Sequence, residues 1–113
     1  MADTLKRYNS NRLTSTTAVV LYTVGSGVTA TVLSISLCNI HASTDALFYL
    51  KVRDGGVDSA STEKYLYLDQ SLPAQGTFIH NSKVTLKVGD TLVGALTASV
   101  DGVDVYISVL EQT

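Results

Sequence analysis

A chain of 113 residues is long enough for one hydrophobic core and too short for two, and its 45% hydrophobic and 16% charged residues exclude a disordered chain. Its 14 valines and 14 threonines are β-branched and favour pleated sheet, so we expect an all-β domain. The single cysteine, Cys38, excludes an internal disulfide, no apolar stretch approaches the ~20 residues of a membrane helix, and we expect no secretory signal.

The net charge of −2 is unevenly distributed along the chain. Residues 1–12 contain three basic side chains and one acidic side chain, a balance of +2, whereas the remainder has 5 basic and 9 acidic side chains, a balance of −4. Three dispersed basic residues do not form the patch that binds phosphates, so we expect no direct nucleic-acid partner. We interpret residues 1–15 as a polar N-terminal arm that docks on an acidic neighbouring chain, and residues 16–113 as a single domain.

Eight short apolar segments follow the arm and are separated by turn residues. Alternation of apolar and polar side chains within these segments is typical of half-buried strands. The expected strands are residues 17–24, 28–40, 46–53, 64–72, 77–80, 83–88, 91–100 and 103–111, with a long exposed loop at 54–63. The alternation predicts a core of Leu33, Ile35, Leu37, Phe48, Leu50, Val52, Val84, Leu86, Val88, Val105, Ile107 and Val109.

Two turns stand out between the later strands. Asp101 and Gly102 separate two alternating segments, which predicts a β-hairpin because both positions tolerate a positive φ. Asp90 follows Gly89 between two other segments, where an aspartate either caps the corner by accepting backbone N–H groups or serves an active site. We favour the corner, since no residue near Asp90 in the sequence is an obvious partner for catalysis.

Seven or eight short strands with no helical stretch indicate an antiparallel sandwich or a small barrel. The Cys…Trp…Cys pattern of immunoglobulin domains is absent, because the chain has one cysteine and no tryptophan. We therefore expect an antiparallel β-sandwich, either Ig-like or jelly-roll-like, with an extended N-terminal arm.

Residues that could support chemistry are few. Cys38 and His41 have the spacing of a metal-ligand pair, but His80 is the only other histidine or cysteine and a structural zinc site needs four ligands. Cys38 lies in an expected strand, where a thiolate has no evident stabiliser. We therefore expect no metal, no cofactor and no enzymatic activity. Tyr65 and Tyr67 alternate along one expected strand and could stack a sugar or a base, although such tyrosines are more often core or interface residues. An exposed row of these rings would favour the alternative from another functional class, a carbohydrate-binding β-sandwich module.

Four stretches resemble the small virion structural proteins of tailed bacteriophages, a loosely defined group of β-sandwiches. The stretches are TLKRYNSNRLTST, VVLYTVGSGVTATVLSISLCNI, KVTLKVGDTLVGAL and VDVYISVLEQT, which together cover most of the chain. The group often has a proline after the Tyr-Thr-Val of the first strand, where this chain has Gly25. The resemblance implies a non-enzymatic component of the virion that decorates the capsid, with a neck, collar or tail position as the alternative.

A protein of this kind needs contacts with other virion proteins and with copies of itself, and it has no membrane partner. We expect Val105, Ile107 and Val109 to face the core, so Tyr106 and Leu110 should face outward with Ser108 between them. Together with the arm, they make up the predicted interface. Its residues are Leu5, Lys6, Arg7, Tyr8, Arg12, Leu13, Tyr106 and Leu110.

Overall fold

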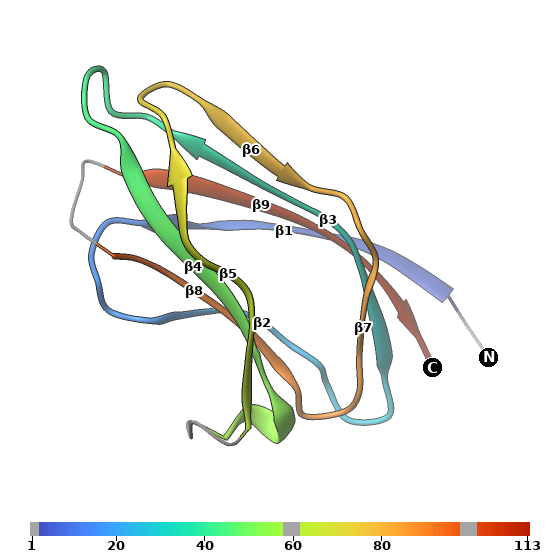
Figure 1. The fold of residues 1–113 in the computed structure, drawn as a ribbon. Helices are drawn as coiled ribbons and strands as arrows, with labels where there is room; N and C mark the ends of the chain where they lie inside the picture. Colours follow the sequence, from blue (N-terminus) through green and yellow to red (C-terminus); the bar gives the residue numbers. More distant parts are fainter. Residues whose placement is uncertain (1–2, 58–61, 98–101) are drawn as a thin grey trace.

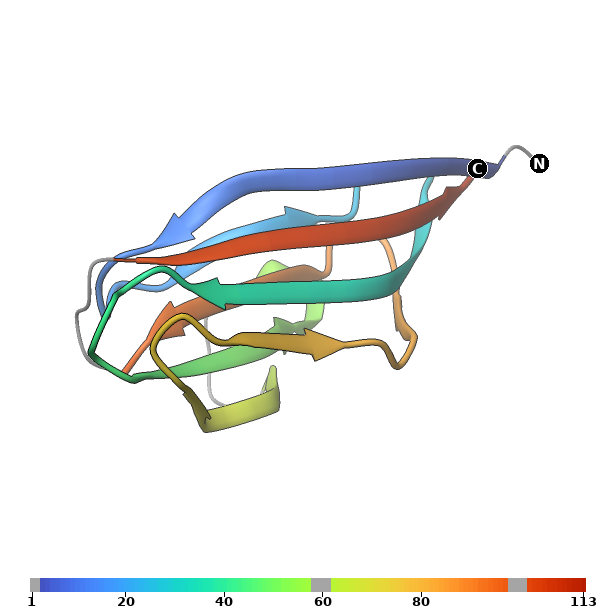
Figure 2. The same ribbon diagram turned by 90° about the horizontal axis from the view of Figure 1, so that it is seen from above.

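Two antiparallel sheets form a β-sandwich, which confirms the predicted fold class (Figures 1 and 2). The structure is a computed structural model that describes residues 3–57, 62–97 and 102–113, and side chains at 7–11 are outside the description. Within these residues the one helix is the three-residue 3-10 turn η1 (Asp54–Gly56), and no helix is long and apolar enough to cross a membrane.

Nine strands are divided between the two sheets. Sheet A contains, in spatial order, β1 (Asp3–Leu13), β9 (Val103–Gln112), β3 (Thr29–Asn39) and β6 (Thr77–His80), with β7 (Val84–Leu86) also paired to β3. Sheet B contains, in spatial order, β2 (Val19–Thr23), β8 (Thr91–Leu96), β4 (Ala46–Arg53) and β5 (Glu63–Leu72).

The pairing of the strands is nested. The first strand pairs with the last, β2 with β8, β3 with β6 and β7, and β4 with β5. Successive pairs alternate between the two sheets, so the chain is one long hairpin wrapped into a double-sheet jelly roll. Of the two kinds of sandwich that the sequence left open, the strand order selects the jelly roll.

Strand β1 corrects the expected boundary at residue 15. Residues 3–13 do not lie outside the sandwich but form an edge strand of sheet A, antiparallel to β9 from Asp3↔Gln112 to Leu13↔Val103 (Figure 2). A register shift between Tyr8 and Asn11 interrupts the strand, which hides its periodicity in the sequence. Main-chain pairing with β9 holds this mostly polar segment in the sheet, and Leu13 at its end is buried in the core.

The prediction of a β-hairpin at Asp101–Gly102 is wrong, because the two flanking strands do not pair with each other. Strand β8 lies in sheet B, and β9 lies in sheet A. The connection between them therefore crosses from one sheet to the other. Asp101 itself lies outside the described residues.

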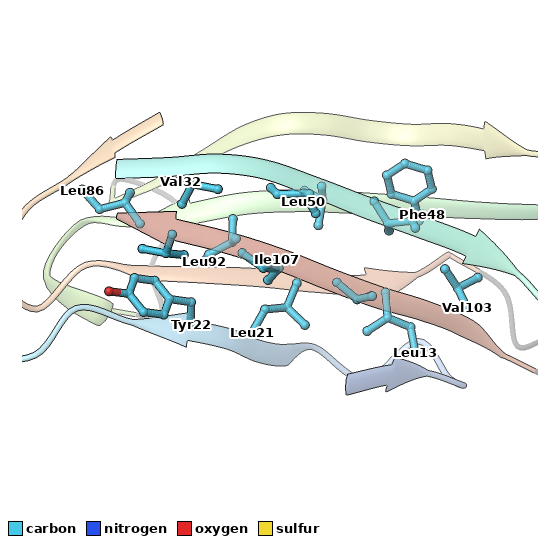
Figure 3. Close-up of a cluster of buried hydrophobic side chains, with 14 of the residues drawn as sticks. Leu13, Leu21, Tyr22, Val32, Phe48, Leu50, Leu86, Leu92, Val103 and Ile107 are labelled. Atoms are coloured by element: carbon cyan, nitrogen blue, oxygen red, sulfur yellow. The ribbon is translucent and has the colours of Figure 1, made fainter. Parts of the chain in front are cut away.

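The core lies between the sheets and is closed at its centre by large apolar side chains (Figure 3). Eight of the twelve predicted core residues are fully buried. These are Ile35, Leu37, Phe48, Leu50, Leu86, Val105, Ile107 and Val109. Val52 and Val84 are partly buried and pack against this cluster.

Two predicted core residues lie elsewhere. A register shift between Val32 and Ser34 turns Val32 inward in place of Leu33. Strand β7 ends at Leu86, so Val88 falls in the turn before β8 and is 52% exposed. In both cases a local irregularity breaks the period of two on which the prediction depended.

Candidate interaction surfaces

The outer face of sheet A, the side turned away from sheet B, is the broadest surface that the strand register defines. Its cross-strand rows are given by the pairs Leu5↔Leu110, Leu110↔Thr31, Ser36↔Tyr106 and Ser36↔Ile79. Small hydroxyl side chains from the central strand β3 separate the larger apolar ones. The residues of the face are Leu5, Thr31, Ser34, Ser36, Cys38, Thr77, Ile79, Tyr106, Ser108 and Leu110.

Large apolar side chains on this face are accessible to solvent. Leu5 is 70% exposed, Ile79 62% and Tyr106 42%. The described charges lie at the ends of the face, where Arg12 pairs with Asp104 at one end and Asp3 accepts a hydrogen bond from Gln112 at the other. Exposed apolar groups gathered on one face are typical of surfaces at which proteins bind one another.

The predicted interface residues divide into three groups. Leu5, Tyr106 and Leu110 lie together on the outer face of sheet A, as the alternation in β9 predicted. Arg7 and Tyr8 pair through their backbones with Ser108 and Ile107, and their side chains lie outside the description.

Lys6, Arg12 and Leu13 make up the third group, whose side chains are engaged within this chain. The ammonium of Lys6 is 2.8 Å from a carboxylate oxygen of Glu111, and Arg12 pairs with Asp104. Leu13 is 1% exposed and belongs to the core, so its place in the predicted interface is corrected. These ion pairs join two basic side chains of β1 to two acidic side chains of β9.

Glu111 is a buried, paired carboxylate that sequence reasoning missed. It is 8% exposed, it accepts a hydrogen bond from the hydroxyl of the buried Tyr22, and it pairs with Lys6. Its position was visible in the sequence, because Glu111 continues the inward series Val105, Ile107 and Val109. A carboxylate in an inward position is stable when polar partners compensate its lost hydration, and here these partners come from two other strands.

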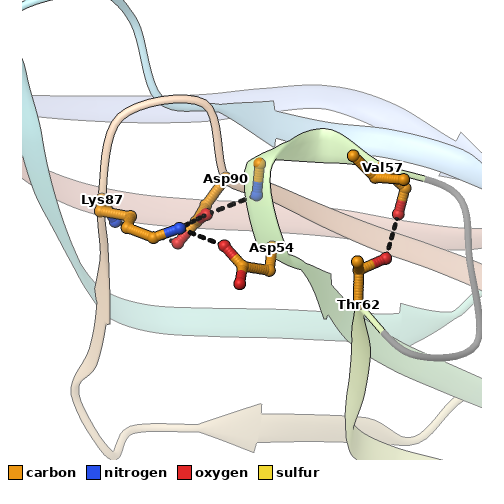
Figure 4. A network of polar contacts seen from close by, with 6 residues as sticks. Asp54, Val57, Thr62, Lys87 and Asp90 are labelled. Atoms are coloured by element: carbon orange, nitrogen blue, oxygen red, sulfur yellow. Dashed lines mark hydrogen bonds and ion pairs between the residues drawn. The ribbon is translucent and has the colours of Figure 1, made fainter.

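Asp90 forms the corner between β7 and β8, in agreement with the interpretation that we favoured (Figure 4). Its carboxylate accepts the N–H of Gly55 at 2.9 Å and that of Lys87 at 3.1 Å, and the ammonium of Lys87 bridges it to Asp54. Gly89 has a φ of +86°, which favours glycine at this turn. Burial raises the pKa of Asp90, but the N–H groups of Gly55 and Lys87 and the charge of Lys87 outweigh this effect, so the pKa is lowered overall.

The lowered pKa of Asp90 predicts an acid-sensitive contribution to stability. A depressed pKa means that the carboxylate stabilises the folded chain above the pKa of the unfolded chain, about 4, and that this stabilisation is lost as the pH falls through the folded value. Asp90→Ala should lower the free energy of unfolding by ~1–3 kcal/mol at pH 7, because two N–H groups lose their acceptor. Urea unfolding at pH 7 and at pH 3 should show that the difference from the wild type shrinks in acid.

Asp54→Ala is the matched control for this prediction, since Asp54 meets the same lysine at an exposed ion pair. It should change stability little at either pH. An Asp90→Ala variant as stable as the Asp54→Ala variant would show that the corner does not depend on the carboxylate.

A covered cation lies on the outer face of sheet B. Lys51 is 7% exposed, and its ammonium lies 3.0 Å from Glu63 and 5.1 and 5.6 Å from the ring centroids of Tyr49 and Tyr65. Arg53 donates to the same carboxylate at 2.7 Å, and the hydrogen bonds from Arg53 and Lys51 lower the pKa of Glu63. The cluster ties β4 to β5 and leaves each of these charges with a partner.

Tyr65 and Tyr67 do not form the exposed row that would have favoured a carbohydrate-binding module. Register shifts in β5 place Tyr65 on the outer face of sheet B and turn Tyr67 inward, where its hydroxyl contacts Nδ1 of His80 at 2.7 Å. The Tyr65 ring meets Tyr49 edge-on, at an interplanar angle of 78°. These two rings therefore do not present the flat platform on which a sugar stacks.

Cys38, His41 and His80 occupy three different environments. Cys38 is on the outer face of sheet A, His80 is buried against Tyr67, and Nδ1 of His41 accepts the backbone N–H groups of Ser43 and Thr44. Across the parts of the chain that the structure describes, no three His, Cys, Asp or Glu side chains gather in a way that would hold a metal ion.

Comparisons with known proteins assign no family to this chain. No protein-family model matches the chain, and no curated protein matches it. Two solved structures of a pentameric capsid protein isolated from metagenomic phage sequences align with 95% of the chain at 17% identity and a TM-score of 0.45. The chain covers 60% and 61% of the length of those two proteins.

Proposed function

We propose that this chain is a non-enzymatic structural protein of a tailed bacteriophage virion, in which it decorates the capsid. Its partners are the capsid subunits and further copies of itself, and its location is the virion. The resemblance of its four sequence stretches to small virion proteins supports the phage assignment. A neck, collar or tail position is the alternative within the same class.

The outer face of sheet A is the observation that carries a role in assembly. Leu5, Ile79 and Tyr106 expose apolar surface on a face whose described charges lie at its ends. A subunit in an ordered array can bury such a face against a neighbour.

The jelly-roll strand order agrees with this proposal. Double-sheet jelly rolls occur in viral capsid proteins and also in lectins, so the fold by itself does not assign a function. The lectin reading depended on the row of Tyr65 and Tyr67, which does not form. The outer face of sheet A therefore supports a role in the capsid, whereas no surface described above supports a role in sugar binding.

Charges introduced together at Tyr106 and Leu110 test the proposal. The variant Tyr106→Asp/Leu110→Asp should still fold, because both side chains point away from the core. Its occupancy on particles of the phage that encodes the chain should fall at least tenfold, the effect of losing about 1.4 kcal/mol of binding free energy in total, since buried unpaired charges are costly. Quantitative mass spectrometry of purified particles measures the occupancy.

Val20→Asp/Leu68→Asp is the matched control, because it places two charges at exposed apolar positions on strands of sheet B. This control should retain wild-type occupancy. Full occupancy by the Tyr106/Leu110 variant would show that the outer face of sheet A is not the interface, and absence of the wild-type chain from particles would overturn the virion role itself.

A further inference from the structure

Strand β1 has one hydrogen-bonded neighbour in its sheet, β9. Within the described residues it pairs with β9 and with no other strand, and it lies at the edge of sheet A. Its described side chains from Asp3 to Lys6 are exposed, and Leu13 at its far end is its described contribution to the core. Main-chain hydrogen bonds and ion pairs therefore join β1 to β9.

The edge of β9 is specific for the sequence of β1. Glu111, nearly buried beside Tyr22, pairs with Lys6, and Asp104 pairs with Arg12. If β1 left this edge empty, Glu111 would lose a cation that compensates its burial, which is costly for a carboxylate. A strand that replaces β1 must bring basic groups to the same two places, and a second copy of β1 does so.

The link between β1 and β2 is long enough for β1 to pair with β9 of its own chain or with β9 of a second copy. Residues 14–18 contain no strand and are mostly exposed. Five extended residues span about 17 Å, whereas packed sheets lie about 10 Å apart, so the link has length in reserve. The link is held in place by few bonds, such as that from the N–H of Leu96 to the carbonyl of Ser15.

We propose that β1 is exchanged between copies on the particle, so that residues 3–13 of one copy pair with β9 of the next. This inference rests on the proposed function, because the high local concentration of copies on a capsid offsets the entropy that exchange costs. The contacts between β1 and β9 are the same whether the two strands belong to one chain or to two. Exchange of an identical element is therefore a low-cost route to linked subunits. The ion pairs Lys6–Glu111 and Arg12–Asp104 would then join neighbouring subunits.

A disulfide between Leu5 and Leu110 reports which chain supplies β1. These residues are direct cross-strand partners on the outer face of sheet A, and opposed residues of antiparallel strands lie about 4.5–5.5 Å apart between Cα atoms, within the range of a disulfide. The variant L5C/L110C, with C38S to remove the native thiol, is assembled on particles, oxidised and separated on a non-reducing gel. Exchange should shift most of the protein from 12.0 kDa to multiples of that mass.

The control variant L5C/I79C, also with C38S, places both thiols on the same face but out of register, since Ile79 pairs with Ser36. It should remain at 12.0 kDa, which excludes cross-links from copies that merely lie near one another. An oxidised L5C/L110C protein that stays at 12.0 kDa would show that each copy keeps its own β1, and free thiols would show that β1 has left β9 altogether. Either result overturns the exchange as long as the variant is present on particles, whereas absence of the wild-type chain from particles overturns the proposed function.

Discussion

Phe48→Ala should lower the free energy of unfolding by ~3–5 kcal/mol, the range for truncation of a buried aromatic side chain. Phe48 is fully buried in β4 and lies at the centre of an aromatic cluster, with its ring centroid 5.3 Å from that of Phe78 and 6.3 Å from that of Tyr67. These rings come from three strands in both sheets, so the cavity left by truncation would open between the two layers. Urea unfolding followed by circular dichroism measures the change.

Leu47→Ala provides the matched control on the adjacent position of the same strand. Leu47 is 40% exposed on the outer face of sheet B, and its truncation should cost less than about 1 kcal/mol. Equal losses from the two substitutions would show that β4 does not present Phe48 to the core.

Alternation predicted the core wherever a strand is regular. Ile35, Leu37, Phe48 and Leu50 are buried because each lies in a segment whose side chains strictly alternate between two faces. The prediction was wrong at Leu33, which borders the register shift after Val32. A bulge adds one residue to one strand, and no property of that residue in the sequence marks it.

Tyr65 and Tyr67 show the same effect on a candidate site. Two residues apart in a regular strand, they would share a face, yet the shifts in β5 place them on opposite sides of sheet B. A sugar-binding row inferred from spacing alone therefore fails when the strand is irregular.

Strand pairing was less accessible to sequence analysis than strand position. The Asp101–Gly102 turn predicted that its two flanking strands pair with each other, but they lie in different sheets. A jelly roll pairs strands that are far apart in the chain, as β1 with β9, and local turn chemistry does not encode such pairs. Likewise, the inward phase of Glu111 was visible in the sequence, but its partners Lys6 and Tyr22 were not.

Leu13→Ala should lower the free energy of unfolding by ~2–5 kcal/mol, although the sequence led us to expect this residue in an arm outside the domain. Leu13 is 1% exposed, pairs with Val103 at the end of β1 and packs into the core between the sheets (Figure 3). Burial of a leucine contributes this much only where the surrounding side chains cannot close the cavity that its removal leaves. Urea unfolding of the full-length chain measures the loss.

Leu5→Ala on the same strand is the control. It tests whether the loss of stability at Leu13 comes from burial in the core or simply from a change in a strand of the sheet. Leu5 also pairs with β9, but it is 70% exposed on the outer face of sheet A, so its truncation should change stability by less than about 0.5 kcal/mol. A Leu13→Ala variant as stable as Leu5→Ala would mean that β1 does not close this end of the core and that residues 1–15 form the independent arm first expected. A large loss at Leu13 alone would mean that β1 completes the sandwich, whether it comes from the same chain or, on a particle, from a neighbouring copy.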